Sequence, residues 1–149
     1  GSQGIYTLAI DEHTAEMKIV RTIPAENSSY LCIDKDEKHL YATIESNSFH
    51  GIDGGGVSAY QIDEDGNLTF INEQPTYGKL PCYVDVESDY LYVSNYEKEH
   101  LYVIHWNRMA ASVAVKERYH IFQAHKKYPM YIAVRSHRMV NIFVCWTVG

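Results

Sequence analysis

Short apolar runs, broken by acidic or glycine-containing turns, fill the first 107 residues of the chain. Runs rich in Ile, Leu, Val and Tyr occur at residues 5–10, 17–23, 30–33 and 40–44. Apolar runs of this length between turn residues predict β-strands that are joined as antiparallel hairpins. The pattern therefore predicts an all-β fold for this part of the chain.

The same pattern recurs about 50 residues further along. Val57–Asp63 repeats the pattern of Ile5–Asp11, and Tyr90–Ser94 repeats that of His39–Thr43. Two strand motifs that recur in the same order, with four short strands per unit, are typical of the blades of a β-propeller. An ordinary β-sandwich with chance similarity is the alternative.

The repeats predict a partial β-propeller of about two to three four-stranded blades. Two blades span about 4–55 and 56–99, a third starts at 100–107, and an irregular or non-native tail follows. A four-stranded sheet cannot bury both of its faces alone, so each blade needs a neighbour on either side. Open blade faces would then be exposed, which predicts self-association of the chain.

Composition and charge narrow the classes of partner. The chain has 13 Tyr and 46% apolar residues, and its formal net charge of −6 argues against nucleic acid or an anionic membrane as the main partner. No apolar run is long enough to span a bilayer, and Gly1 to Gly4 lack the features of a signal peptide. Three widely spaced cysteines favour a reducing cytoplasm with buried thiols over a disulfide framework. The eight histidines form no metal-binding motif, so no metal or other cofactor is expected.

The charge pattern changes abruptly after Asn107. Residues 1–107 hold 6 Lys/Arg and 18 Asp/Glu, whereas residues 108–149 hold 7 Lys/Arg and one acid, Glu117. We hypothesise that 108–149 is a frame-shifted continuation. A shift of one nucleotide can convert Met109-Ala110 and Met139-Val140 into Asn/Asp-Gly, the dipeptides that hairpin turns favour.

A genuine tail is the alternative. Met109 to His120 would then form a helix, favoured by Ala110, Ala111 and Lys116. Lys126-Lys127 and the segment Arg135 to Arg138 would form a basic patch for an acidic partner. On this alternative the chain is a truncated propeller that acts as a protein-interaction module.

Seven short motifs, in order, resemble those of the cytoplasmic lactonase family with a seven-bladed β-propeller, whose named activity is 6-phosphogluconolactonase. The motifs are Gln3–Tyr6, Ser28–Leu31, His39–Ala42, Gly55–Tyr60, Gln74–Thr76, Leu80–Tyr83 and Leu91–Tyr96. The resemblance implies a carboxylic ester hydrolase that opens 6-phosphoglucono-δ-lactone, a small sugar lactone of the pentose phosphate pathway, to its acid. Muconate cycloisomerases are a related branch, because one fold hosts several reactions.

The resemblance also implies a catalytic segment with a Gln-x-x-Pro-His-x-His pattern. The printed chain lacks this pattern, although the stretch from Lys126 to Val134 permits it in the shifted frame. The catalytic residues are therefore unknown. We expect the printed chain to be inactive as an enzyme.

Five residues near the expected ends of inner strands are candidates for binding substrate. They are Tyr30, Glu45, Tyr83, Asn95 and Tyr96. The family often has a His where this chain has Tyr83, which weakens any acid–base role there. The tyrosines could instead only pack along the channel, and Glu45 could be a solvated turn residue.

Two further motifs invite functional readings that the sequence does not favour. Gly54-Gly55-Gly56 lacks the following Lys-Ser/Thr and helix of a phosphate-binding loop, so a flexible lead-in to a strand is expected. Cys82 could be a nucleophile, but no sequence feature places a His beside it. A packing role is expected for Cys82.

Overall fold

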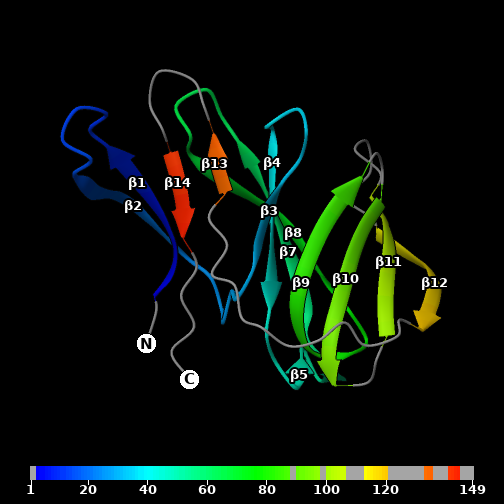
Figure 1. The fold of residues 1–149 in the computed structure, drawn as a ribbon. Helices are drawn as coiled ribbons and strands as arrows, with labels where there is room; N and C mark the ends of the chain where they lie inside the picture. Colours follow the sequence, from blue (N-terminus) through cyan, green and yellow to red (C-terminus); the bar gives the residue numbers. More distant parts are fainter. Residues whose placement is uncertain are drawn as a thin grey trace.

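The computed structural model contains three four-stranded antiparallel sheets and one short hairpin (Figure 1). It describes residues 3–87, 90–97, 100–106, 113–120, 133–135 and 141–144. The middle sheet follows the chain in the order β3 (Leu31–Ile33), β4 (His39–Ile44), β7 (Gly56–Ile62) and β8 (Leu68–Pro75). The third sheet is likewise formed by β9 (Lys79–Glu87), β10 (Tyr90–Glu97), β11 (His100–Trp106) and β12 (Val113–His120).

The N-terminal sheet is built from both ends of the chain. Its strand order is β13 (Ala133–Arg135), β14 (Asn141–Val144), β1 (Gly4–Ile10) and β2 (Met17–Pro24). β1 pairs with β14 in antiparallel register, with Leu8 opposite Ile142. The first two strands of the chain thus occupy the outer half of a sheet whose inner half is formed by β13 and β14.

The middle sheet buries both of its faces, which is what stacked blades require. Side chains alternate along β4, so Tyr41 belongs to one apolar cluster and Leu40 and Ala42 to another. The first cluster joins the middle sheet to Val84, Leu91, Val93 and Ile104 of the third sheet. The second cluster joins it to Ile5 of the N-terminal sheet. The predicted all-β partial propeller is confirmed.

The sheets begin at a different phase from the sequence repeat. The repeat unit 4–55 supplies β1 and β2 to the N-terminal sheet and β3 and β4 to the middle sheet. The sequence similarity between repeats is the same wherever the unit is taken to begin. Hydrogen-bonded pairing, in contrast, fixes the strand at which each sheet begins. β4 pairs with β7 across the junction of the two repeats, with Ala42 opposite Ser58.

The helix that the genuine-tail alternative places over Met109 to His120 is wrong for Val113–His120, which is a strand, and residues 109–112 lie outside the described residues. This strand pairs along its length with β11 and completes the third sheet. Valine favours a strand, and the pairing of β12 with β11 outweighs the helix preference of Ala110, Ala111 and Lys116. The basic residues Lys126, Lys127 and Arg138 lie outside the described residues.

Short β5 (Ser48–Phe49) and β6 (Ile52–Asp53) form a hairpin within the connection between β4 and β7. This connection lies at the end of the sheets where β8 also passes into β9, at the bottom of Figure 1. One edge strand of each sheet lies close to the others, since β3 contacts both β9 and β13. We call β3, β9 and β13 the inner strands. These inner strands position the candidate site.

Candidate functional site

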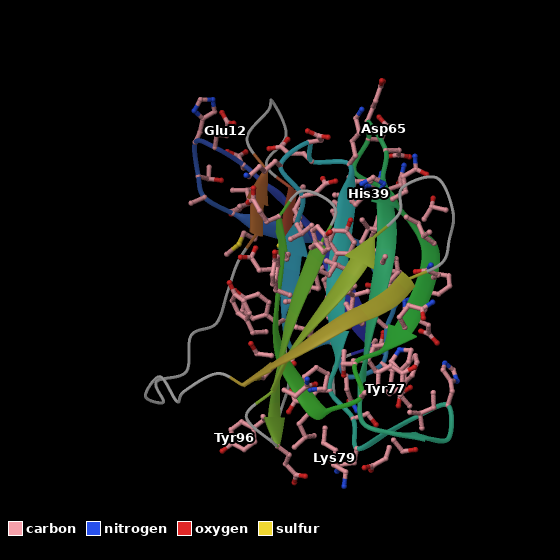
Figure 2. The ribbon with its side chains drawn as sticks, turned by 90° about the vertical axis from the view of Figure 1, so that its right-hand side faces the viewer. Glu12, His39, Asp65, Tyr77, Lys79 and Tyr96 are labelled. Atoms are coloured by element: carbon pink, nitrogen blue, oxygen red, sulfur yellow. The ribbon has the colours of Figure 1, made fainter. Side chains whose placement is uncertain are left out.

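Three connections meet at one end of the sheets and are tied together by backbone hydrogen bonds. Glu45 N donates to Asn27 O at 3.0 Å, and Leu80 N donates to Ser46 O at 3.0 Å. Figure 2 shows Tyr77, Lys79 and Tyr96 at this end, and Glu12, His39 and Asp65 at the opposite end. We call this end, formed by residues 24–31, 44–56 and 75–80, the connection face.

Tyr30 and Tyr83 are brought into direct contact beside the connection face. Their ring centroids lie 4.7 Å apart and the ring planes are tilted by 52°. Tyr30 precedes β3 and Tyr83 lies on β9, so the contact joins the inner strands of two neighbouring sheets. The hydroxyl of Ser29 supports the same junction, at 3.0 Å from Thr43 Oγ1 and 3.4 Å from Pro81 O.

A ladder of contacts continues along this junction. Cys32 Sγ lies 3.7 Å from Asp85 Oδ1, and Lys35 Nζ lies 2.7 Å from Glu87 Oε1. Tyr83 donates its hydroxyl hydrogen to Asp85 Oδ2 at 3.3 Å. Residues at equivalent places in two repeats therefore contact one another, as Tyr30 and Tyr83 do.

Asp85 is a candidate site residue that sequence analysis missed. It shares one face of β9 with Tyr83, because side chains two apart along a strand point the same way. Its position between Val84 and Val86, on an inner strand, was the available sequence signal. Burial and the Asp85 carboxylate raise the pKa of the Cys32 thiol to about 11, so Cys32 is a poor nucleophile at neutral pH.

Glu45 is half-buried where β4 ends, close to Cys82. Partial desolvation of the thiol, and then the Glu45 carboxylate, raise the pKa of Cys82, although the residue as a whole is exposed. The thiol donates to Ser94 O at 3.6 Å. Cys82 is solvent-exposed, so the expectation of buried thiols is wrong for it, while Cys32 is half-buried and Cys145 lies outside the described residues. A raised pKa is the opposite of what a thiolate nucleophile needs.

Asn95 and Tyr96 cannot both serve one site through their side chains. They are neighbours on β10, and neighbouring side chains on a strand point to opposite faces. Asn95 is buried and accepts a hydrogen bond from Thr76 Oγ1 at 3.0 Å, whereas Tyr96 is 59% exposed. The geometry gives Asn95 a role in holding the β8–β9 connection and leaves Tyr96 at the surface.

Gly54, Gly55 and Gly56 lead into β7 as expected, but their place is tightly packed. All three are buried, and Gly55 N donates to Gly78 O at 2.8 Å. A Cβ on Gly55 would lie 2.3 Å from Pro81 Cδ. These glycines are required by the close approach of two connections, so the expectation of a flexible lead-in is wrong.

Within the described residues, no group of three or more His, Cys, Asp or Glu side chains is arranged to hold a metal ion. No helix of a length and apolarity that would cross a bilayer occurs in the part of the chain that the structure describes.

The stacked four-stranded sheets and the paired inner strands define the chain as part of a β-propeller. The family model for lactonases with a seven-bladed β-propeller matches residues 1–130. The chain therefore belongs to this lactonase family. The match begins in the N-terminal sheet and continues past Asn107 into the basic tail.

Two curated relatives carry the name 6-phosphogluconolactonase. The Bacillus subtilis protein is 34% identical over 110 residues, which cover 69% of this chain and 29% of the relative. The Formosa agariphila protein is 31% identical over 98 residues, which cover 62% of this chain and 27% of the relative. The chain thus spans less than a third of the length of these relatives.

Solved structures agree with the fold. A candidate 6-phosphogluconolactonase from Bacteroides fragilis superposes with a TM-score of 0.70 at 25% identity, over 91% of this chain and 38% of that one. A second, from Bacteroides uniformis, gives 0.69 at 26% identity, over 80% of this chain and 34% of that one. A periplasmic gluconolactonase of Pseudomonas aeruginosa, at 23% identity and a TM-score of 0.64 over 78% of this chain and 39% of that one, shows the same fold.

Proposed function

We propose that this chain is one part of a hydrolase that opens a sugar-acid lactone of the 6-phosphoglucono-δ-lactone type to the free acid. The observation that carries the proposal is the 34% identity to a relative named 6-phosphogluconolactonase. The contacts beside the connection face support it, because Tyr30 and Tyr83 of neighbouring sheets meet there and Tyr83 donates a hydrogen bond to Asp85. Fold alone does not fix a reaction, so the substrate must be tested directly.

Lactone hydrolysis needs a base to activate water and donors to stabilise the developing oxyanion. The Tyr30–Tyr83 pair and Glu45 would bind the hydroxyls of the sugar acid, and Asp85 would orient Tyr83 through their hydrogen bond. Asn95 would fix the β8–β9 connection beside them, and Tyr96 would contact substrate from the surface. The catalytic base would come from the Gln-x-x-Pro-His-x-His segment that the printed chain lacks.

The test compares two proteins: the printed chain, and the product of the same gene with the shifted frame restored after Asn107. We expect the printed chain to leave the hydrolysis of 6-phosphoglucono-δ-lactone at its spontaneous rate, and the restored protein to accelerate it. Glu45→Gln and Tyr83→Phe in the restored protein should raise KM. A folded restored protein that ignores this lactone but converts cis,cis-muconate would overturn the proposal in favour of the cycloisomerase branch.

We further propose that the protein is cytoplasmic and that its main partner is the small-molecule lactone, with neither nucleic acid nor a membrane surface. The formal charge of −6 supports the exclusion of nucleic acid and of an anionic membrane surface, because both are polyanionic. For the chain on its own we propose self-association through open blade faces. Met17 and Ile19, 62% and 61% exposed on the outer strand β2, support that proposal.

A further inference from the structure

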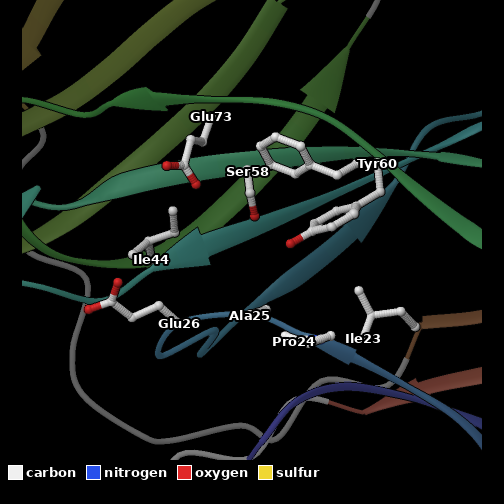
Figure 3. Close-up of a pocket in the computed structure, with 9 residues that line it drawn as sticks. Ile23, Pro24, Ala25, Glu26, Ile44, Ser58, Tyr60 and Glu73 are labelled. Carbon is white, nitrogen blue, oxygen red and sulfur yellow. The ribbon is translucent and has the colours of Figure 1, made fainter. Parts of the chain in front are cut away.

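A cavity of about 330 Å³ lies away from the inner strands, between the N-terminal and middle sheets. One wall is the end of β2 and the segment that follows it, up to Glu26, and the other wall is formed by β4, β7 and β8. Figure 3 shows the two walls facing each other across the cavity. Its volume is at the small end of the range for ligand sites, which suits a compact molecule with one ring.

One part of the cavity is apolar and aromatic. Ile23 and Ile44 line it from opposite walls, together with Tyr60 and Phe70. The rings of Tyr60 and Phe70 meet edge to face, with centroids 5.8 Å apart. This contact holds the two rings in a fixed geometry beside the cavity. The surface they offer suits the flat or cyclic body of a ligand.

The other part of the cavity carries acceptors and negative charge. Ser58 and Tyr60 are two apart on β7, and in Figure 3 their hydroxyls project from the same wall toward the segment that bears Glu26. Burial raises the pKa of Tyr60, so its phenol stays neutral at physiological pH. Glu73 of β8 also lines the cavity. Among the residues that the structure describes, no Lys or Arg lines the cavity.

Glu73 is half-buried and already holds a nitrogen partner. Its Oε1 contacts Nε2 of His50, which lies in the turn between β5 and β6. His50 is mostly exposed and is not among the cavity-lining residues. The imidazole of His50 thus contacts the Glu73 carboxylate from outside the cavity. A ligand nitrogen inside the cavity would compete with His50 for this carboxylate.

We propose that this cavity binds a small organic ammonium ion that carries an apolar ring. The ammonium group donates to Glu73 and to the Ser58 hydroxyl, with the Glu26 carboxylate adding attraction from the opposite wall. The ring packs against Ile44, Tyr60 and Phe70. Carboxylates beside aromatic faces recognise organic cations through charge-assisted hydrogen bonds and cation–π attraction. The cavity adjoins the connection face and shares residues 24–26 and Ile44 with it, but the proposal does not depend on the lactonase proposal.

The test is titration of the full chain with phenethylamine, and binding is measured by calorimetry and by the change in tyrosine fluorescence. The neutral analogue of the same shape, 2-phenylethanol, is titrated in the same way. We expect saturable binding of the amine and at least about ten-fold weaker binding of the alcohol, because the alcohol loses the charge-assisted bond. Glu73→Gln should weaken amine binding by a similar factor. Glu64→Gln, in the exposed β7–β8 turn, is the matched control and should leave it unchanged.

A second variant guards against misfolding of Glu73→Gln. His50→Ala removes the side chain that competes for Glu73, so it should tighten amine binding several-fold while the melting temperature shows a folded protein. Equal affinity for amine and alcohol would overturn the proposal and indicate adventitious apolar binding only. Weaker amine binding to His50→Ala would also overturn it.

Discussion

Tyr30 and Tyr83 occupy equivalent places in two successive repeats, and their rings contact each other with centroids 4.7 Å apart. Cys32 and Asp85, and then Lys35 and Glu87, continue the same ladder along the inner strands. A repeat protein stacks each unit on its neighbour, so equivalent surfaces of neighbouring units meet. The ladder makes the junction of the middle and third sheets the natural place to test the architecture.

Truncation of either tyrosine should destabilise the protein. We expect Tyr30→Ala to lower the free energy of unfolding by about 1–3 kcal/mol, since a half-buried aromatic side chain loses its packing. A double-mutant cycle with Tyr83→Ala should return a coupling of about 0.5–1.5 kcal/mol. Urea unfolding measures both, with exposed Tyr96→Ala as the control. Strict additivity of the Tyr30 and Tyr83 effects would contradict the contact.

The Cys32 thiol should react slowly and should speed up when its neighbouring charge is removed. With a pKa of about 11, Cys32 is ionised to about one part in a thousand at pH 8. Asp85→Asn removes a carboxylate that disfavours the thiolate, so the pKa should fall and the fraction of thiolate at pH 8 should rise. Peptide-resolved alkylation by iodoacetamide across pH 7–10 measures this. Glu87→Gln, which changes a carboxylate on the same strand, is the control.

The loss of stability caused by Gly78→Ala should be partly offset by a second substitution at Asn95. A Cβ on Gly78 would lie 2.5 Å from Cγ and 2.8 Å from Cβ of Asn95, so Gly78→Ala overpacks the β8–β9 connection. We expect it to cost about 1–3 kcal/mol. Adding Asn95→Ala removes Cγ and Nδ2, the two nearest obstructing atoms, and leaves only the Cβ at 2.8 Å, so the double variant should be more stable than the two single effects predict. Thermal unfolding of the four proteins decides it, and simple additivity would show that the clash is absent.

The isolated chain should associate as its concentration rises. Met17, Ile19 and Phe70 are all more than half exposed, and β2 is the outer edge of its sheet. An apolar edge strand is a template for pairing with another chain. Light scattering between about 1 and 100 µM should show growing mass, and Ile19→Lys should reduce it. A stable monomer over this range would count against open blade faces.

The frame-shift hypothesis makes its own prediction about the gene. Sequencing around the codon of Asn107 should show a frame that, after a one-nucleotide shift, continues with Asn/Asp-Gly turns and the Gln-x-x-Pro-His-x-His pattern. The family match in the printed frame continues to residue 130, past the proposed shift after Asn107. Each codon from 108 to 130 must therefore be compared with the lactonase family in both reading frames. An intact frame without similarity to lactonases in the shifted reading would end the hypothesis.

The sequence predicted the elements of the fold because strand periodicity and turns are local properties. The alternation that places Leu40 and Tyr41 on opposite faces of β4 can be read from the printed residues, and so can the equivalence of Tyr30 and Tyr83. It also located the ends of strands from which the candidate site is built. The order of the motifs was enough to indicate the family.

Only the tertiary structure decided how these elements combine, because long-range pairing leaves no local signature. The sheets start half a repeat away from the sequence unit, and Val113–His120 pairs as a strand where Ala110, Ala111 and Lys116 had favoured a helix over 109–120. Asp85 entered the candidate site through its contacts with Tyr83 and Cys32, and Asn95 turned out to face Thr76 in the interior. The cavity between the N-terminal and middle sheets likewise exists only once two distant segments pack against each other.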